Sequence, residues 1–193
     1  LRTVMETNYF GPVLLSKAVL PHMRERRTGH IIMVSSLSGL AGLPCDFSYT
    51  SSKFALEGAA EAMRHEVDRW GIKVSLVEAG MYATNLLGKS KDGEESIFPH
   101  SYDKESPYRD LMEYKSRRIK ERLSHAFEPK VVGDLFVEIA NSSGNRFRWT
   151  ADPVAKKVIS ELHRHDDFSR DQYLKKISDT DWWSEGEMLA TQV

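Results

Sequence analysis

The chain contains one cysteine, Cys45, in 193 residues, so no disulfide bond can form within it. A lone thiol is typical of a protein kept in a reducing compartment. We expect a cytoplasmic protein, with peripheral association at a membrane as the alternative. Long apolar runs are also missing, since none approaches the roughly eighteen residues that a membrane-spanning helix requires. The sequence therefore predicts no transmembrane segment.

An excess of charge of either sign is absent as well, because 27 basic and 28 acidic residues give a net charge of −1. Nucleic acid is not an expected partner, since no basic surplus is available to neutralise phosphates. No metal site is expected either, because His163 and His165 stand two positions apart and would not share a helix face. With 40% hydrophobic residues the chain can form one core. We predict a single domain over residues 1–193.

The first half of the chain alternates between helix-like and strand-like patterns. Apolar residues recur at three- and four-residue spacings before Gly29, and Pro12 and Pro21 predict a kink or a local break there. The expected elements are a helix over 2–27, a strand over 30–34, a helix over 49–69 ending at Gly71, and a strand over 72–78. This order predicts parallel β-α-β pairing, in which ligands bind beyond the carboxyl ends of the strands.

The second half combines a polar segment with a helical tail. Residues 85–127 contain a polar loop and a helix that opens at Ser106–Pro107, the expected N-cap and first helical residue. Residues 128–193 are expected to form a final helix over 129–141, a short strand over 145–150 and a charged tail. The pair Trp182–Trp183 is expected to pack the tail over the core, with partner or membrane binding as the alternative.

Three side chains that can move a proton follow the first predicted strand. Ser36 stands just past its end, Tyr49 follows by thirteen positions, and Lys53 follows Tyr49 by four. A spacing of four places Tyr49 and Lys53 on one helix face. A free tyrosine has a pKa of about 10, and a nearby ammonium favours the phenolate, which allows proton exchange with an alcohol or ketone. An isolated Tyr-x-x-x-Lys is more often a core tyrosine beside a surface lysine. Further motifs around the pair are therefore needed to indicate a catalytic site.

Together with two further motifs, this arrangement resembles the catalytic core of the short-chain dehydrogenase/reductase family. Asn8 opens Asn-Tyr-Phe-Gly, similar to the family's Asn-x-x-Gly, and Gly80 lies in Glu-Ala-Gly-Met-Tyr-Ala-Thr, similar to its Pro-Gly-x-x-x-Thr. The resemblance implies that Tyr49 is the general acid–base and that Ser36 orients the reacting oxygen. It implies that Lys53 lowers the tyrosine pKa and binds ribose, and that Asn8 supports a water and proton relay. The implied cofactor-binding residues are Tyr49, Lys53, Gly80, Tyr82 and Thr84.

The resemblance also sets expectations for the fold and the cofactor. It implies an α/β structure, the carboxyl-terminal portion of a doubly wound, Rossmann-type parallel sheet, with a catalytic core over residues 1–84. No Gly-x-x-x-Gly-x-Gly loop for a cofactor pyrophosphate occurs in the chain, so we expect the amino-terminal cofactor-binding part to be absent. Ala79 replaces the family's usual proline. The implied cofactor is NADP or NAD, with NADP slightly favoured.

Within the family, Gly-Leu-Pro before the tyrosine and Ser-Lys-Phe-Ala-Leu-Glu-Gly over residues 52–58 are similar to the branch of estradiol 17β-dehydrogenase and photoreceptor-type retinol dehydrogenase. That branch implies hydride transfer between NAD(P) and a lipophilic, retinoid- or steroid-like alcohol or ketone. A homodimer through the two long helices is also implied. The expected substrate contacts are Ser36, Phe98, Tyr108 and Met112. The alternative is a catalytically inactive truncated form that acts as a binding or interaction module.

Overall fold

The computed structural model describes residues 1–84 and 105–186, which form two compact units. The first unit contains residues 1–80 and 130–166, and the second contains the described residues of 81–129 and 167–193. Phe98, one of the predicted substrate contacts, lies outside the described residues.

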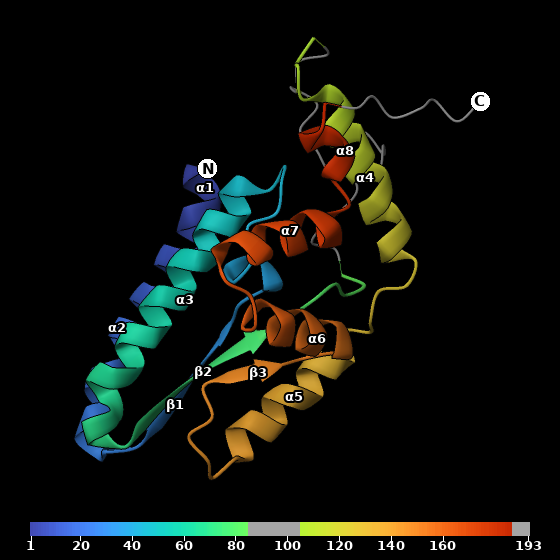
Figure 1. Ribbon diagram of the computed structural model, residues 1–193. Helices are drawn as coiled ribbons and strands as arrows, with labels where there is room; N and C mark the ends of the chain where they lie inside the picture. Colours follow the sequence, from blue (N-terminus) through green and yellow to red (C-terminus); the bar gives the residue numbers. More distant parts are fainter. Residues whose placement is uncertain (85–104, 187–193) are drawn as a thin grey trace. The chain divides into compact units, whose positions relative to one another are not determined.

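A three-stranded parallel sheet forms the centre of the first unit (Figure 1). Its strands are β1 (Gly29–Val34), β2 (Ile72–Glu78) and β3 (Arg148–Thr150), in the spatial order β1-β2-β3. β2 is buried along nearly its whole length, as expected for a parallel strand covered on both faces. The predicted α/β class and parallel pairing are confirmed.

The register of the sheet decides where two of the candidate site residues lie. Val34 pairs with Val77, and the pairing continues past β1 because the Ser35 N–H donates to the Val77 carbonyl at 2.9 Å. Ser36 and Gly80 each follow the end of their strand by two residues. Both residues therefore lie at the same edge of the sheet, where ligands of parallel sheets bind.

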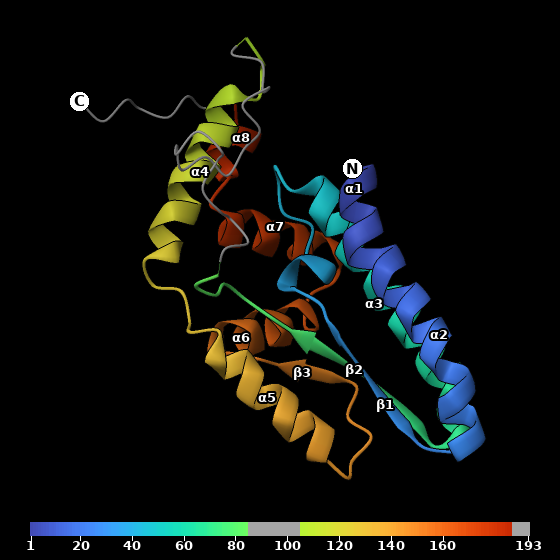
Figure 2. The same ribbon diagram turned by 180° about the vertical axis from the view of Figure 1, so that it is seen from behind.

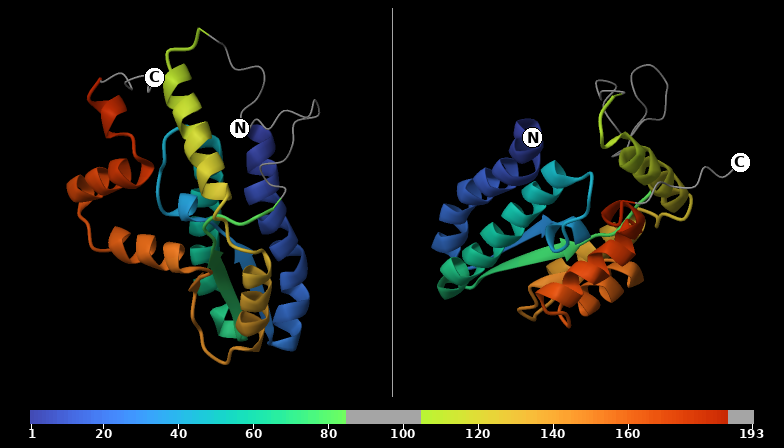
Figure 3. Two further views of the ribbon diagram at one scale, coloured as in Figure 1. Left: turned by 90° about the vertical axis from the view of Figure 1, so that its right-hand side faces the viewer. Right: turned by 45° about the horizontal axis from the view of Figure 1, so that its top comes forward.

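Helices cover both faces of this sheet. One face carries α1 (Arg2–Met5), a π-helical turn (Glu6–Phe10) and α2 (Gly11–Arg26), which together form a rod that runs beside α3 (Phe47–Val67) (Figure 2). The other face carries α5 (Lys130–Asn141) and α6 (Pro153–Leu162) (Figure 3). Two 3₁₀ turns complete the unit, Leu37–Gly39 after β1 and Asp68–Trp70 after α3.

The predicted break in the first helix takes the form of the π-helical turn. The Gly11 N–H donates to the Glu6 carbonyl, five residues earlier, which widens the turn by one residue. Pro12 has no N–H, and in a regular α-helix its ring would meet the carbonyl of Asn8. The wider turn accommodates this proline and leaves the rod continuous. Pro21 lies inside α2 without ending it.

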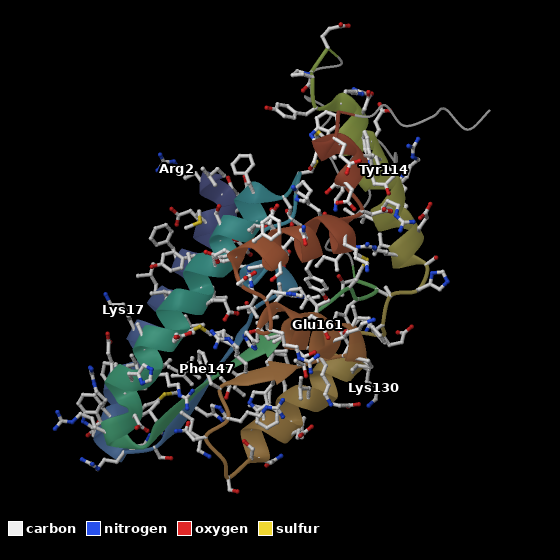
Figure 4. The ribbon with its side chains drawn as sticks, in the orientation of Figure 1. Arg2, Lys17, Tyr114, Lys130, Phe147 and Glu161 are labelled. Carbon is white, nitrogen blue, oxygen red and sulfur yellow. The ribbon has the colours of Figure 1, made fainter. Side chains whose placement is uncertain are left out.

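The core of the first unit lies between the sheet and the helices α2 and α3. Its buried residues are Leu20, Ile31, Met33, Leu56, Ala60, Met63, Val67, Ile72, Val74, Leu76 and Phe147. Figure 4 shows two opposite cases, because Lys17 extends outward from α2 whereas Phe147 lies against the sheet and is 7% exposed. These apolar residues of α3 and of the strands recur at the spacing that turns them inward, whereas α2 also exposes Leu14 and Leu15.

The described part of the second unit is mainly helical, with α4 (Arg109–Leu123), α7 (Asp167–Ser178) and α8 (Asp181–Ser184). The hydroxyl of Tyr114, labelled in Figure 4, donates to Asp179, which follows α7. The ring of Trp182 lies 5.4 Å from that of Tyr114, and the ring of Trp183 lies 6.4 Å from that of Tyr108. The two tryptophans therefore pack on α4. In neither described stretch does a helix combine the length and the apolar character needed to cross a bilayer.

α4 begins later than the sequence predicts. Its first residue is Arg109, and Tyr108 occupies the N-cap position. The Oγ of Ser106, the expected N-cap, accepts from the Tyr108 N–H at 3.3 Å, and its carbonyl accepts from the Arg109 N–H at 3.0 Å. These bonds close a turn ahead of the helix, so Pro107 lies in that turn and not at the first helical position.

Candidate functional site

Ser36 stands where the chain leaves the sheet. Its φ of −156° is extended, and its Oγ accepts a hydrogen bond from the Ser38 N–H at 3.2 Å, which begins the 3₁₀ turn. The adjacent Ser35 is 2% exposed, and its Oγ meets no hydrogen-bond partner among the described residues. Of the two serines, Ser36 is the one whose hydroxyl lowers the pKa of the Tyr49 phenol through a hydrogen bond.

Tyr49 lies in the first turn of α3 and is partly buried. Burial raises the pKa of its phenol above the ordinary value, because a buried phenolate loses its hydration. The hydrogen bond with Ser36 lowers this pKa, and the charge of Asp46 raises it further. The net direction is upward, so the phenol is held in its protonated form in this structure.

Lys53 lies one helical turn after Tyr49, and its Nζ is 5.6 Å from the centre of the tyrosine ring. The ammonium donates a hydrogen bond to the carbonyl of Val34 at 2.9 Å. Burial lowers the pKa of Lys53, whereas the charges of Glu57 and Glu78 raise it. The sequence led us to expect that Lys53 lowers the pKa of Tyr49, but burial of the phenol has the larger effect here.

Asn8 is joined to the helix that carries Tyr49. It lies in the π-helical turn, and its Nδ2 donates to the Oγ of Ser52 at 3.1 Å. The Ser52 hydroxyl in turn donates to the carbonyl of Tyr49 at 2.7 Å. The hydrogen bonds from Asn8 thus lead to the backbone of Tyr49. The resemblance had instead implied a relay toward Lys53.

Gly80 is held in place by Asp152. The Gly80 N–H donates to Oδ2 of Asp152 at 3.1 Å, and Oδ1 accepts from the Ala155 N–H at 2.8 Å as the N-cap of α6. A Cβ on residue 80 would lie 2.9 Å from Oδ2, so a larger residue would displace the carboxylate. One carboxylate therefore fixes both the turn after β2 and the start of α6.

The remaining predicted site residues belong to the second unit. Tyr82 forms a parallel bridge with Phe127, and their ring centres are 6.0 Å apart. Thr84 is exposed, Tyr108 is 57% exposed and Met112 is 8% exposed. The structure thus brings Asn8, Ser36, Tyr49 and Lys53 together in the first unit, with Gly80 at the same sheet edge, and places these other residues in the second unit.

The side chains at this sheet edge suit a nicotinamide–ribose group. An ammonium has three N–H donors, and Val34 accepts one from Lys53, so the group keeps donors of the kind that ribose hydroxyls accept. The chain has no glycine-rich loop for a pyrophosphate. The residues present therefore fit the nicotinamide–ribose half of NAD(P). Within residues 1–84 and 105–186 no group of three potential metal ligands occurs.

Asp152 and Glu78 were not among the site residues predicted from the sequence. Asp152 precedes Pro153, a combination typical of an N-cap and a first helical residue, but this signal does not reveal the bond to Gly80. Glu78 ends an otherwise apolar strand and is 0% exposed. A fully buried carboxyl group is rare without a partner, so an acidic residue in such a strand could have indicated a buried polar group.

The sequence matches known proteins over most of its length. The profile of the short chain dehydrogenase family matches residues 1–95. Retinol dehydrogenase 8 of Bos taurus is 37% identical over 145 residues, which are 74% of this chain and 46% of that protein. Estradiol 17-beta-dehydrogenase 1 of Rattus norvegicus is 30% identical over 174 residues, which are 83% and 50% of the two chains. The chain thus spans half or less of the length of these relatives.

Solved structures share the fold. A short-chain dehydrogenase from Streptomyces avermitilis has a TM-score of 0.66 at 25% identity, covering 92% of this chain and 61% of its own. A short chain dehydrogenase from Burkholderia cenocepacia in complex with NADP has a TM-score of 0.62 at 20% identity, covering 92% and 58%. With the profile match to its first 95 residues, the chain belongs to the short-chain dehydrogenase/reductase family.

Proposed function

We propose that the first unit performs the proton transfer of an NAD(P)-dependent oxidoreductase that acts on a lipophilic alcohol or ketone. The observation that carries the proposal is the meeting of Ser36, Tyr49 and Lys53 at one sheet edge. The serine hydroxyl hydrogen-bonds to the phenol, and the ammonium lies 5.6 Å from the phenol ring. The similarity to a retinol dehydrogenase and an estradiol dehydrogenase supports a retinoid- or steroid-like substrate.

In this function Tyr49 exchanges a proton with the substrate oxygen, and the Ser36 hydroxyl holds that oxygen beside the phenol. The nicotinamide cofactor supplies or accepts the hydride. Burial keeps the phenol protonated, which suits reduction, because the phenol then gives its proton to the oxygen of the carbonyl as it becomes an alcohol. Oxidation requires the phenolate, and the positive charge of Lys53 favours that form.

The cofactor-binding residues are proposed from the motifs that resemble those of the family. Lys53 would bind the ribose hydroxyls with the donors that Val34 does not take. Gly80, Tyr82 and Thr84 would contact the nicotinamide, as their motif in the family implies. Asn8 would steady the amino-terminal turn of α3 through Ser52. NADP and NAD both remain candidates, with NADP slightly favoured by the resemblance.

Substrate contacts and self-association complete the proposal. Tyr108 and Met112 of the second unit are proposed to contact the apolar part of the substrate, since such sites are mostly apolar with few polar groups. Phe98 was predicted beside them and lies outside the described residues.

A homodimer through α2 and α3 is supported by the large apolar side chains exposed on these helices, namely Leu14, Leu15 and Phe54.

The decisive experiment replaces Tyr49 by phenylalanine in the full-length protein. We expect turnover of a retinoid or steroid alcohol to fall about a hundredfold to ten-thousandfold, the usual contribution of a general acid–base, while NADPH affinity stays. Tyr9→Phe is the matched control, because the Tyr9 ring packs edge-on against Phe10 in the rod. Substantial turnover in Tyr49→Phe would overturn the assignment.

The same assay distinguishes the proposed enzyme from the alternative, a catalytically inactive binding module. A wild-type full-length protein that oxidises no retinoid or steroid alcohol with either cofactor would favour a non-catalytic binding module. That result would leave the fold and the family unchanged, because both rest on the sheet and on the sequence match.

A further inference from the structure

A pair of carboxyl groups lies buried beside Lys53. Glu57 follows Lys53 by four residues on α3, and Glu78 is the last residue of β2. Glu57 is 5% exposed and Glu78 is 0% exposed. Burial of an ionised carboxylate costs much free energy unless the charge is paired and hydrogen-bonded. The two groups therefore need a source of neutralisation inside the protein.

Arg148, the first residue of β3, neutralises one member of the pair. Its guanidinium donates to Oε2 of Glu57 at 3.1 Å and to Oε2 of Glu61 at 2.8 Å. Its nearest approach to Oε1 of Glu78 is 3.7 Å, which is too long for a hydrogen bond. Arg148 therefore stabilises negative charge on Glu57 and Glu61 more than on Glu78.

Three oxygens of the pair are buried without an ordinary donor. Both oxygens of Glu78 and Oε1 of Glu57 are buried and meet no donor among the residues that the structure describes. Burial, the charge of Glu57 and a side-chain hydrogen bond with Glu57 together raise the pKa of Glu78 to about 9. Two ionised carboxylates have acceptors only, so a bond between them requires that one carries a proton.

We propose that Glu57 and Glu78 share one buried proton, held on Glu78, and that the pair presents a single negative charge that keeps Lys53 in place as an ammonium. The effect on Lys53 rests on the function proposed for that lysine. The shared proton rests only on the burial and contacts of the two carboxyl groups. The charged groups that act on Glu78 are Glu57 and Lys53 from α3 and Arg148 from β3, and Arg148 also binds the exposed Glu61.

The pair acts on Lys53 through charge. Burial lowers the pKa of Lys53, and negative charge on the Glu57–Glu78 pair opposes this effect. With one proton on the pair, Lys53 faces one carboxylate charge at neutral pH. Glu57 and Glu78 are therefore positioning residues: they hold the state of the ammonium and do not touch the reacting atoms.

Infrared difference spectroscopy of the full chain tests the shared proton directly. At pH 7 an ordinary carboxyl group is ionised, so wild type should show the band of one protonated carboxyl that Glu78→Gln lacks. Glu61→Gln is the matched control, because Glu61 also binds Arg148 but its side chain is 56% exposed. This variant should keep the band. A wild-type spectrum without the band overturns the proposal, whether or not the Glu78 variant folds.

The pH dependence of stability gives an independent readout. Glu78 holds its proton in the folded chain up to about pH 9, whereas in the unfolded chain its pKa returns to the ordinary value of 4.5. The folded state therefore binds more protons between these values, and stability decreases as pH rises through the window. The unfolding constant of wild type should increase about tenfold more per pH unit than that of Glu78→Gln. Parallel curves for the two proteins would contradict the proposal, and Glu61→Gln should parallel wild type.

Titration of the Lys53 side chain by NMR tests whether the charge of the carboxyl pair keeps Lys53 as an ammonium. Glu57→Gln removes the charge that faces the ammonium and should lower the pKa of Lys53. Glu61→Gln, at an exposed position outside the buried pair, should leave that pKa unchanged. If Glu57→Gln does not lower the pKa of Lys53, or if Glu61→Gln lowers it equally, the positioning role is wrong. None of these measurements uses turnover, so failure of the proposed enzyme activity would be seen separately.

Discussion

The ammonium of Lys53 and the carbonyl of Val34 are joined by a hydrogen bond of 2.9 Å. Val34 is the last residue of β1, and Ser36 follows it by two residues. The bond therefore ties α3, which carries Tyr49, to the strand end that carries Ser36. Two roles of Lys53 can be separated by experiment: holding α3 against β1, and the proposed binding of ribose.

Lys53→Met keeps the length of the side chain and removes its charge. We expect cofactor affinity of the full-length protein to fall about tenfold to hundredfold, because a hydrogen bond to a charged group contributes about 1.5–3 kcal/mol. Turnover should fall with it, and Lys53→Arg should recover part of the affinity. Fluorescence titration with NADPH measures the change, with Lys17→Met on the exposed face of α2 as control. Unchanged affinity in Lys53→Met would restrict the lysine to a structural role.

Asp152→Ala removes one carboxylate that serves two backbone N–H groups, those of Gly80 and Ala155. We expect the free energy of unfolding to fall by about 1–2 kcal/mol, from loss of the N-cap and of the Gly80 bond. Asp152→Asn retains one acceptor oxygen and should lose less. Urea denaturation measures both variants. Equal losses in the two would show that the negative charge, and not the acceptor geometry, is what matters.

Substitution of Gly71 and of Gly58 by alanine should change the free energy of unfolding in opposite directions. Gly71 ends α3 and its 3₁₀ turn with φ +68°, and a Cβ there would lie 3.0 Å from the carbonyl of Arg27. Gly71→Ala should therefore lower the free energy of unfolding by about 1–2 kcal/mol. Gly58 lies inside α3, where a Cβ meets nothing within 4 Å. Gly58→Ala should raise stability by about 0.5–1 kcal/mol in the same denaturation series. A neutral Gly71→Ala would mean that the turn can adopt another conformation.

His30 should make the chain less stable in mild acid. Its Nε2 lies 2.9 Å from the hydroxyl of Ser75, which itself donates to the carbonyl of Arg146 at 3.1 Å. Burial, and then the charge of Lys73, lower the pKa of His30 below 6.5. Protonation therefore favours the unfolded chain, and the contribution of His30 to stability is lost as pH falls through 6.5 toward the folded pKa.

Thermal unfolding of wild type and His30→Gln between about pH 7 and pH 5 measures this loss. Wild type should lose stability more steeply than His30→Gln, and His22→Gln, at an exposed position of α2, should follow wild type. An identical slope for His30→Gln would show that the histidine stays neutral or that its environment relaxes on protonation.

The sequence predicted those features that depend on local patterns. The strands expected over 30–34 and 72–78 are found at Gly29–Val34 and Ile72–Glu78, and the helix expected over 49–69 is found at Phe47–Val67. β-branched runs and helical periodicity act over a few residues, so they are visible in the sequence. The common sheet edge of Ser36 and Gly80 follows from the strand ends once parallel pairing is inferred.

Features that depend on distant contacts could not be predicted. The bond from Asn8 to Ser52 and the bond from Gly80 to Asp152 join residues far apart in the chain. The upward direction of the Tyr49 pKa depends on burial, which the spacing to Lys53 does not reveal. The start of α4 was placed too early because the turn at Ser106 uses the same residue types as a helix N-terminus. The functional roles of the site residues stay predictions.

The bridge between Tyr82 and Phe127 has a consequence for how such a protein can diversify. The Phe127 N–H donates to the Met81 carbonyl at 3.1 Å, and the Ala83 N–H donates to the Phe127 carbonyl at 2.9 Å. These are backbone bonds, so they hold together the ends of the intervening segment whatever side chains it carries. Doubling the length of a closed loop adds only about 0.6 kcal/mol of closure entropy. A change of length between residues 83 and 127 that leaves α4 intact therefore costs little closure entropy, and the sheet edge that carries Ser36 and Tyr49 can be inherited unchanged while the segment varies.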